Sequence, residues 1–302
     1  MGEFKPEWLA LREAADVLAR SSRLTRVIAD KFPDDAELHV LDIATGTGAN
    51  LRYLAEHLPP RQSWVLVDRD PVLLAELPMR MRSWGIARGL EVAGEGDALL
   101  LTGARLTCRV ARCRRNLATD IEGGDGDIFA GRTFVTASAL LDLVSERWLR
   151  ALASRCRESC AAVLFALTYD GRIRCSPEEP EDTTIRALVN THQRTDKGMG
   201  SALGATACGW AEQCFASLGY HVQREPSDWV LGPDARELQR QLINGWAEAA
   251  IAVGSGQPSS IRSWQMRRVA HVAAGRSRLI VGHEDLGAWL PTSQLVEKPC
   301  PL

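Results

Sequence analysis

The stretch LDIATGTGAN, residues 41–50, joins an apolar run to a segment with helical periodicity. The apolar run, residues 37–44, overlaps the start of this stretch and is apolar on both faces, as a buried strand is. A helix is expected after it, because apolar residues recur there at three- and four-residue steps: Leu51, Leu54, Ala55 and Leu58. Gly46 and Gly48 allow a sharp turn and keep side chains away from a ligand. The stretch therefore predicts a strand, a tight turn and a helix, with a ligand above the turn.

An acidic residue ends the next predicted strand. Residues 63–68, SWVLVD, form a short apolar run that stops at Asp68, 20 positions after Gly48. An acid at about this offset from a glycine turn binds the ribose hydroxyls of adenosine-containing cofactors. Asp42 ends the first predicted strand, and we expect its carboxylate beside the same crevice. The two acids and the turn together predict a cofactor that contains adenosine.

Strand and helix patterns alternate along most of the chain. Further strands are predicted at 105–111, 133–138, 161–169, 220–225 and 276–282. Apolar strands that alternate with helices are typical of a parallel sheet covered on both faces, which is the doubly wound α/β class. The region 86–131 is less regular than the rest. Pro78 is expected to kink or interrupt the helix predicted at 71–84.

Four segments resemble the motifs of class I S-adenosylmethionine-dependent methyltransferases. D-x-A-x-G-x-G at 42–48 is similar to motif I, and VDRDPVLL at 67–74 to the acidic second-strand motif. FVTASALLDLVS at 134–145 is similar to the fourth-strand motif, and RRNLATD at 114–120 lies where the family places a polar residue against adenine. The resemblance implies a Rossmann-like, mainly parallel sheet of seven strands with one antiparallel strand. It also implies S-adenosylmethionine as the cofactor, and methyl transfer from its sulfonium.

The same resemblance assigns the cofactor to residues within these motifs. Asp68 would bind the ribose, Asn116 would face the adenine with Leu117 beside it, and the end of the fourth strand would line the methionine end. The full cofactor-binding set expected is Asp42, Ala44, Thr45, Gly46, Gly48, Asn50, Asp68, Arg69, Asn116, Leu117, Ser138 and Ala139.

The methyl acceptor is expected in loops outside the carboxyl ends of the strands. Residues 170–206 are polar and rich in glycine, and we interpret them as an irregular acceptor-binding insertion. His192 is the candidate general base near neutral pH, and Tyr169 is a second catalytic candidate. Arg194 and Lys197 would bind a carboxylate or phosphate of the substrate. For each residue, a solvated polar side chain is the alternative interpretation.

Two further segments have competing interpretations. Asp142 is a candidate substrate-binding residue, or else it caps the helix that begins near Ser145. Trp8 and Arg12, in the predicted N-terminal helical flap of residues 1–35, would close over the pocket or simply pack an amphipathic helix. The remaining residues, 36–302, are expected to form one methyltransferase domain.

Composition limits the classes of partner. The net charge of -2 favours neither nucleic acid nor an anionic membrane. No apolar run is long enough to span a bilayer, and the eight cysteines contain no C-x-x-C pair and no metal-ligand set. We expect a cytoplasmic protein that binds a small-molecule acceptor and no metal, in an oligomeric state that the sequence leaves open.

The sequence therefore predicts methyl transfer to an oxygen or nitrogen of a small molecule. An RNA or protein methyltransferase is the first alternative, supported by the arginine-rich run at 105–115. A nicotinamide-dependent reductase or a non-catalytic cofactor-binding protein is the second. Against the reductase, Leu51 stands where a dinucleotide turn has its third glycine, and no lysine–tyrosine pair is evident.

Overall fold

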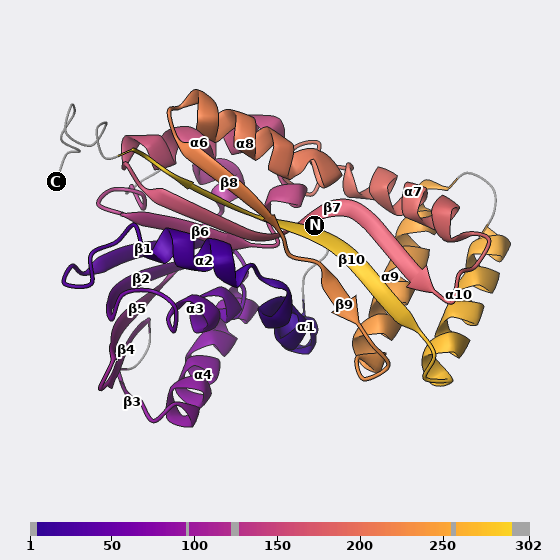
Figure 1. Cartoon of the computed structure of the whole chain (residues 1–302), viewed down its shortest axis with the longest axis horizontal. Coiled ribbons are helices and arrows are strands. Elements are labelled where there is room, and N and C mark those ends of the chain that lie inside the picture. The colour runs from indigo at the N-terminus through magenta and orange to yellow at the C-terminus, as the bar shows by residue number, and fades with distance from the viewer. Residues whose placement is uncertain (1–4, 95–96, 122–126, 255–257, 292–302) are drawn as a thin grey trace.

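A computed structural model describes residues 5–94, 97–121, 127–254 and 258–291 (Figure 1). Seven strands form the central sheet in the order β5-β2-β1-β6-β7-β10-β8. Their bounds are β1 Leu38–Ile43, β2 Arg61–Asp68, β5 Leu106–Arg114, β6 Phe134–Ser138, β7 Ala162–Ser176, β8 His221–Pro226 and β10 Arg278–Trp289. β10 runs antiparallel to β7 and β8, and the pairs from β5 to β7 are parallel. The predicted mainly parallel sheet with one antiparallel strand is confirmed.

Three further strands extend this sheet beyond the prediction. β3 (Glu91–Ala93) and β4 (Ala98–Gly103) add antiparallel strands at the β5 edge, and β9 (Trp229–Leu231) pairs with β10. β3 and β9 have three residues each, too few to show an alternating pattern in the sequence.

Helices cover both faces of the sheet (Figure 1). One face carries α2 (Ser22–Ala29), α3 (Ala49–Leu54) and α4 (Pro71–Ala87), and the other carries α5 (Leu117–Asp120), α6 (Glu146–Glu158) and α8 (Ala207–Ser217). Each face has its own apolar core, formed around Leu24, Leu51 and Leu77 on one side and Trp148, Phe165 and Phe215 on the other. α4 contains Pro78 and continues through it, so the proline does not interrupt the helix. Among the described helices, none has both the length and the apolar character needed to cross a bilayer.

A third core lies where β7 and β10 extend past the other strands. α7 (Asp182–Gln193), α9 (Arg236–Val253) and α10 (Pro258–Ala273) pack there, with α9 in contact with both other helices. The expectation of an irregular loop over 170–206 is therefore wrong in part, since this segment holds the end of β7 and the whole of α7. Ile185 and Val189, four residues apart, are buried on one face of α7. Helices from the far end of the chain cover that face, so its burial is a tertiary effect.

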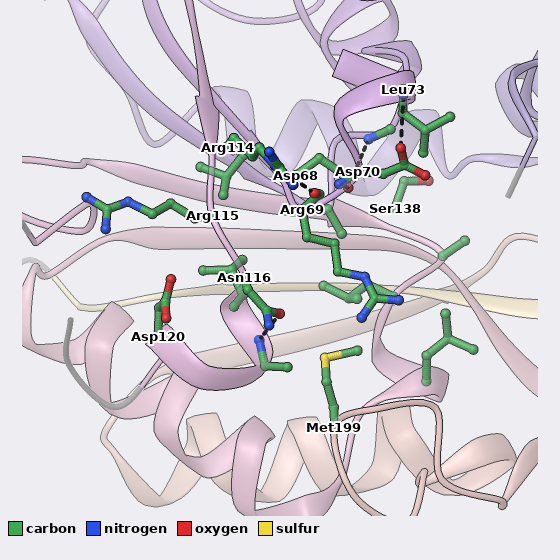
Figure 2. A pocket seen from close by; sticks show the side chains of 18 of the residues that line it. Asp68, Arg69, Asp70, Leu73, Arg114, Arg115, Asn116, Asp120, Ser138 and Met199 are labelled. Atoms are coloured by element: carbon green, nitrogen blue, oxygen red, sulfur yellow. Dashed lines mark hydrogen bonds between the residues drawn. The ribbon is translucent and has the colours of Figure 1, made fainter. Parts of the chain in front are cut away.

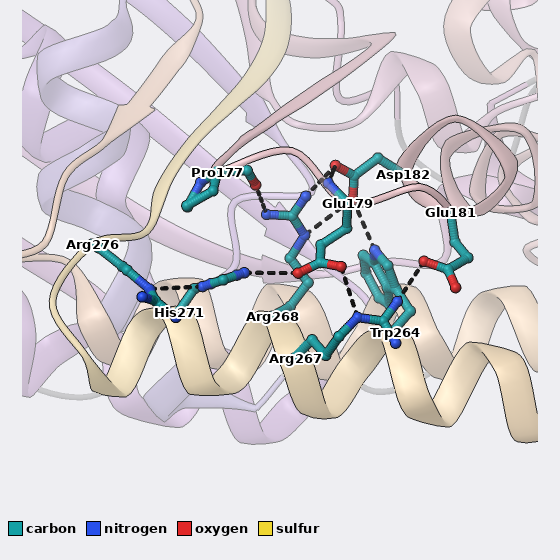
Figure 3. A network of polar contacts seen from close by, with 9 residues as sticks. All are labelled: Pro177, Glu179, Glu181, Asp182, Trp264, Arg267, Arg268, His271 and Arg276. Atoms are coloured by element: carbon teal, nitrogen blue, oxygen red, sulfur yellow. Dashed lines mark hydrogen bonds and ion pairs between the residues drawn. The ribbon is translucent and has the colours of Figure 1, made fainter.

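A polar network joins α10 to the start of α7 (Figure 3). The Arg268 side chain is fully buried and donates to Asp182 from Nε at 3.0 Å and to the carbonyl of Pro177. Trp264 Nε1 also donates to Asp182, at 2.8 Å, and Glu179 accepts from the neighbouring Arg267 at 2.7 Å. The third helical layer, formed by α7, α9 and α10, is thus held by ion pairs as well as by apolar packing.

The N-terminal segment predicted as a flap contains two helices with different surroundings. α2 belongs to the main core, where Leu24 and Ile28 are fully buried. α1 (Pro6–Ala19) lies across the carboxyl ends of the strands, where Glu13 accepts from Arg52 of α3 at 2.7 Å. α1 is therefore the part of the segment that is placed to cover a site.

Candidate functional site

The glycine turn after β1 has the geometry that its sequence predicts. Ala44, Gly46 and Gly48 all have positive φ, at 53°, 56° and 80°, and α3 begins directly after Gly48. The backbone N–H of Thr45 donates to the carbonyl of Val67 in β2 at 3.0 Å. A positive φ strains an alanine such as Ala44, and strain of this kind is concentrated at functional sites.

A buried polar network holds the turn from below. The Asp42 carboxylate accepts from Thr45 Oγ1 at 2.5 Å and from Asn50 Nδ2 at 2.6 Å. Asn50 in turn accepts from Arg20 Nη1 at 2.7 Å. Burial raises the pKa of Asp42 to about 6, against the two hydrogen bonds that favour its charged form. Asp42, Thr45, Gly48 and Asn50 lie outside the lining of the cavity described next, so their contacts stabilise the turn itself.

Asp68 connects the end of β2 to the turn. Its Oδ2 accepts from the backbone N–H of Gly46 at 2.8 Å, and its Oδ1 accepts from the N–H of Asp70 at 3.0 Å. Burial raises the pKa of Asp68, while these backbone donors favour the charged form. The carboxylate is therefore held in one orientation at the edge of the cavity.

A cavity of about 750 Å³ lies outside the carboxyl ends of β1, β2, β5 and β6 (Figure 2). This is where the strand order reverses, because β1 has β2 on one side and β6 on the other. Such a reversal is where doubly wound sheets bind ligands, and the volume suits a small molecule. Eight of the predicted cofactor residues line it: Ala44, Gly46, Asp68, Arg69, Asn116, Leu117, Ser138 and Ala139.

The β5 end of the cavity combines polar and apolar groups. Asn116 caps the short helix α5, with its Oδ1 accepting from the N–H of Ala118 at 3.3 Å. Trp148 of α6 donates from Nε1 to the carbonyl of Leu117 at 2.7 Å and also lines the cavity. Asp120, four residues after Asn116, reaches the same wall, although it is not among the residues predicted from the motifs. The helical spacing from Asn116 was the signal that could have identified it.

Two segments far apart in sequence close the remaining sides. Leu9 and Arg12, three residues apart on α1, line the cavity, and Met199 lines it from the loop after α7. Arg69 extends across the cavity from the end of β2 toward Met199 (Figure 2). Nothing in the sequence pattern indicates that Leu9 and Met199 reach the same hollow.

The predicted acceptor-side residues Tyr169, His192, Arg194 and Lys197 do not line the cavity. The Tyr169 hydroxyl donates to Asn190 Oδ1 at 2.8 Å, and burial raises its pKa, so it is held as a neutral donor. Partial burial lowers the pKa of His192, which is neutral at neutral pH. Lys197 Nζ donates to the carbonyl of His192 at 3.0 Å, while Arg194 is exposed at the end of α7.

Asp142 does not cap the following helix. That position is taken by Ser145, whose Oγ accepts from the N–H of Trp148 at 3.3 Å. Asp142 is instead buried and accepts from Gln193 Nε2 at 3.3 Å. The helix-cap interpretation is therefore wrong. Burial raises the pKa of Asp142 to about 6, although the charge of Arg12 lowers it. Asp142 therefore lies between α1 and α7, behind the β6 end of the cavity.

No protein-family model matches this sequence, and no curated protein matches it. Solved structures do overlay on it. A phosphoethanolamine N-methyltransferase 2 of Haemonchus contortus, in complex with phosphomonomethylethanolamine and S-adenosylhomocysteine, is 14% identical with a TM-score of 0.45; the overlay covers 96% of this chain and 59% of that one. A cyclopropane synthase of Mycobacterium tuberculosis is 10% identical with a TM-score of 0.44, over 88% of this chain and 82% of that one.

A third structure, a SAM-dependent methyltransferase of Geobacter sulfurreducens in complex with S-adenosyl-L-homocysteine, is 14% identical with a TM-score of 0.43, over 95% of this chain and 98% of that one. Likenesses this distant transfer neither a ligand nor a substrate. The strand order β5-β2-β1-β6-β7-β10-β8, with β10 antiparallel, decides the architecture. This chain has a Rossmann-like, doubly wound α/β fold. Within the described ranges, no group of three His, Cys, Asp or Glu side chains is arranged to hold a metal.

Proposed function

We propose that this protein transfers a methyl group from S-adenosylmethionine to an oxygen or nitrogen of a small-molecule acceptor. The observation that carries the proposal is the carboxylate of Asp68 at the edge of a cavity whose floor is the turn at Gly46. A carboxylate held at the end of the second parallel strand is suited to bind two ribose hydroxyls.

The residues of the cavity fit the cofactor in order along the sheet edge. The β5 end offers apolar contacts from Leu117 and Trp148 and polar groups from Asn116 and Asp120, which suit a flat, nitrogen-rich ring. Asp68 on β2 would hold the sugar. Gly46, which has no side chain, would let the part of the cofactor beyond the sugar approach the backbone. When bound, the cofactor supplies a methyl group on a cationic sulfur, which is an electrophile.

The protein would then orient the two reactants, exclude water from them and accept a proton from the methyl acceptor. Leu9 and Arg12 of α1 cover the cavity and limit the access of water. Alignment of the two reactants supplies several kcal/mol, on the scale of about 7–11 kcal/mol for well-oriented pairs. His192, neutral at neutral pH, and Asp142 are the groups beside the β6 end that would accept the acceptor's proton. Lys197 and Arg194 would attract an anionic part of the acceptor.

Calorimetric titration with S-adenosylhomocysteine and with NADH tests the proposal. Binding of S-adenosylhomocysteine and no binding of NADH is expected. Binding of NADH in preference would favour the reductase alternative, and binding of neither would contradict the proposal.

The contacts of the arginine-rich run at 105–115 favour a small acceptor over RNA. Arg109 pairs with Glu37 at 3.0 Å and Arg112 with Asp97 at 2.8 Å, while Arg114 and Arg115 line the cavity. Two of the five arginines are thus paired with acids and two line the cavity, so the run does not form one continuous basic face for a phosphate backbone. Filter binding with tRNA checks this, and retention of tRNA at physiological salt would support the RNA alternative.

A further inference from the structure

We infer that Arg12 binds the carboxylate at the amino-acid end of S-adenosylmethionine, and that it sets the preference of the cavity for ligands that carry this group. The inference rests on the proposed function. It starts from the position of Arg12 relative to the sheet. Arg12 lines the cavity and its guanidinium carbon lies 4.9 Å from the ring centre of Trp229, on the strand β9 that pairs with β10. Its charge also acts on Asp142, just after β6.

Arg12 lies at the end of the cavity opposite to the β5 end, where the adenine would bind. The sheet order runs from β5 through β2 and β1 to β6, so a ligand with its ring over β5 and its sugar at Asp68 directs its other end toward β6. The other cations of the described lining come from the β2 and β5 ends, namely Arg69, Arg114 and Arg115. Among the described lining residues, Arg12 is therefore the cation placed to meet a negative charge at the β6 end.

The glycine turn itself has few backbone donors left for an anion. The N–H of Gly46 donates to Asp68, that of Thr45 to the carbonyl of Val67, and that of Gly48 to the carbonyl of Thr45 at 2.9 Å. Arg52, which lies beside Gly48, donates to Glu13 and to the carbonyl of Thr47. A carboxylate above this turn thus needs a side-chain donor from elsewhere.

Arg12 is held ready for such a ligand. Its hydrogen bonds within the described residues all go to Asp16, from Nε at 3.0 Å and from Nη2 at 3.1 Å, which leaves Nη1 for another acceptor. Asp16 is fixed in turn by Trp229 Nε1 at 3.0 Å. A guanidinium held on one edge and stacked on a ring loses little freedom when a carboxylate binds. Leu9, one turn earlier on α1, lies against Gly46 and aligns this helix with the turn.

The test compares two ligands that differ in the amino-acid end. S-adenosylhomocysteine carries the carboxylate, whereas 5′-methylthioadenosine keeps the adenosine and the sulfur and lacks the amino-acid part. Binding of both is measured by calorimetry on the full chain and on Arg12→Met, which keeps an apolar stem against Trp229. We expect Arg12→Met to bind S-adenosylhomocysteine roughly 10- to 100-fold more weakly. Its affinity for 5′-methylthioadenosine should change by less than about threefold.

Glu13→Gln is the matched control, because it weakens another contact of α1, with Arg52, outside the cavity. It should leave the ratio of the two affinities unchanged. Equal weakening of both ligands in Arg12→Met would overturn the inference and assign Arg12 a packing role. An unchanged affinity for S-adenosylhomocysteine would overturn it as well.

A second measurement uses the unaltered protein, in case Arg12→Met does not fold. The carboxamide of S-adenosylhomocysteine removes the negative charge and keeps the size of the ligand. It should bind the natural sequence at least tenfold more weakly than the acid does, by roughly the strength of one charged hydrogen bond; equal binding would contradict the inference alone. Failure of all three ligands to bind would instead contradict the proposed function, and the inference with it.

Discussion

The carboxylate of Asp68 accepts a hydrogen bond from the backbone N–H of Gly46 at 2.8 Å, which ties the end of β2 to the turn after β1. One side chain thereby fixes the floor of the cavity and presents a charge at its edge. The two roles separate in part, because an amide loses the charge and keeps one of the two acceptor oxygens.

Replacement of Asp68 should weaken cofactor binding. In Asp68→Ala, the binding free energy of S-adenosylhomocysteine should fall by roughly 2–4 kcal/mol, since two ribose hydroxyls lose a charged acceptor. Asp68→Asn should lose less affinity and less stability than Asp68→Ala, because its single oxygen can still accept from the N–H of Gly46, although the amide nitrogen that replaces the other oxygen cannot accept from the N–H of Asp70. Calorimetry and thermal unfolding measure the two effects. Full affinity in Asp68→Ala would remove Asp68 from the site.

A methyl group at Gly46 should disturb both the turn and the helix above it. Gly46 has a φ of +56°, and a Cβ there would lie 3.0 Å from Leu9 Cδ1. The backbone strain costs about 1–2 kcal/mol of stability, and displacement of Leu9 should weaken binding of S-adenosylhomocysteine in addition. Gly89→Ala is the matched control, because Gly89 has a φ of +68° with nothing within 4 Å of the added carbon.

In urea titrations, Gly89→Ala should lose the unfolding free energy of backbone strain alone, and Gly46→Ala should lose at least as much; only Gly46→Ala should lose affinity in calorimetry. If Gly89→Ala weakens binding as much as Gly46→Ala does, the contact with Leu9 is not the cause.

Asp142 should make stability depend on pH. Its pKa is raised from 3.8 to about 6 in the folded protein, mainly by burial, so the folded chain keeps this proton while the unfolded chain loses it. The contribution of Asp142 is therefore most favourable below about pH 4 and is lost as the pH rises toward 6, by about 3 kcal/mol in all. Asp142→Asn lacks this titration, so its stability relative to the natural sequence should increase between pH 4 and pH 6.

Urea unfolding of the two proteins at four pH values from 4.5 to 7.5 measures this difference. Other buried groups titrate in both proteins and cancel. A difference that stays constant over this range would show that Asp142 has the same pKa in the folded and unfolded chains.

The ion pairs of the third helical layer should differ in strength according to burial. Arg268→Met should cost about 3–5 kcal/mol of unfolding free energy, because it leaves Asp182 without the fully buried partner. Arg267→Met, the next residue on α10, should cost less than about 1 kcal/mol, since its side chain is 41% exposed to solvent. Equal losses in the two variants would indicate that the burial of Arg268 adds nothing.

The local pattern of the sequence determined the sheet and the cofactor side of the cavity. Two glycines after an apolar run, and an acid at the end of the next one, fixed the turn at Gly46 and the position of Asp68, because both depend on backbone angles and on spacing within about 30 residues. The same reasoning explains why Ala44 and Ser138 line the cavity: each ends a parallel strand at the same edge of the sheet.

The tertiary structure alone decided what closes this cavity. The sequence leaves two interpretations of Arg12, and the structure places it in the lining, whereas Leu9 and Met199 reach the cavity with no signal in their own segments. The apolar face of α7 packs against α9 and α10, which are distant in the chain. Such contacts depend on packing between remote elements, and the periodicity of one segment carries no information about the segment that will cover it.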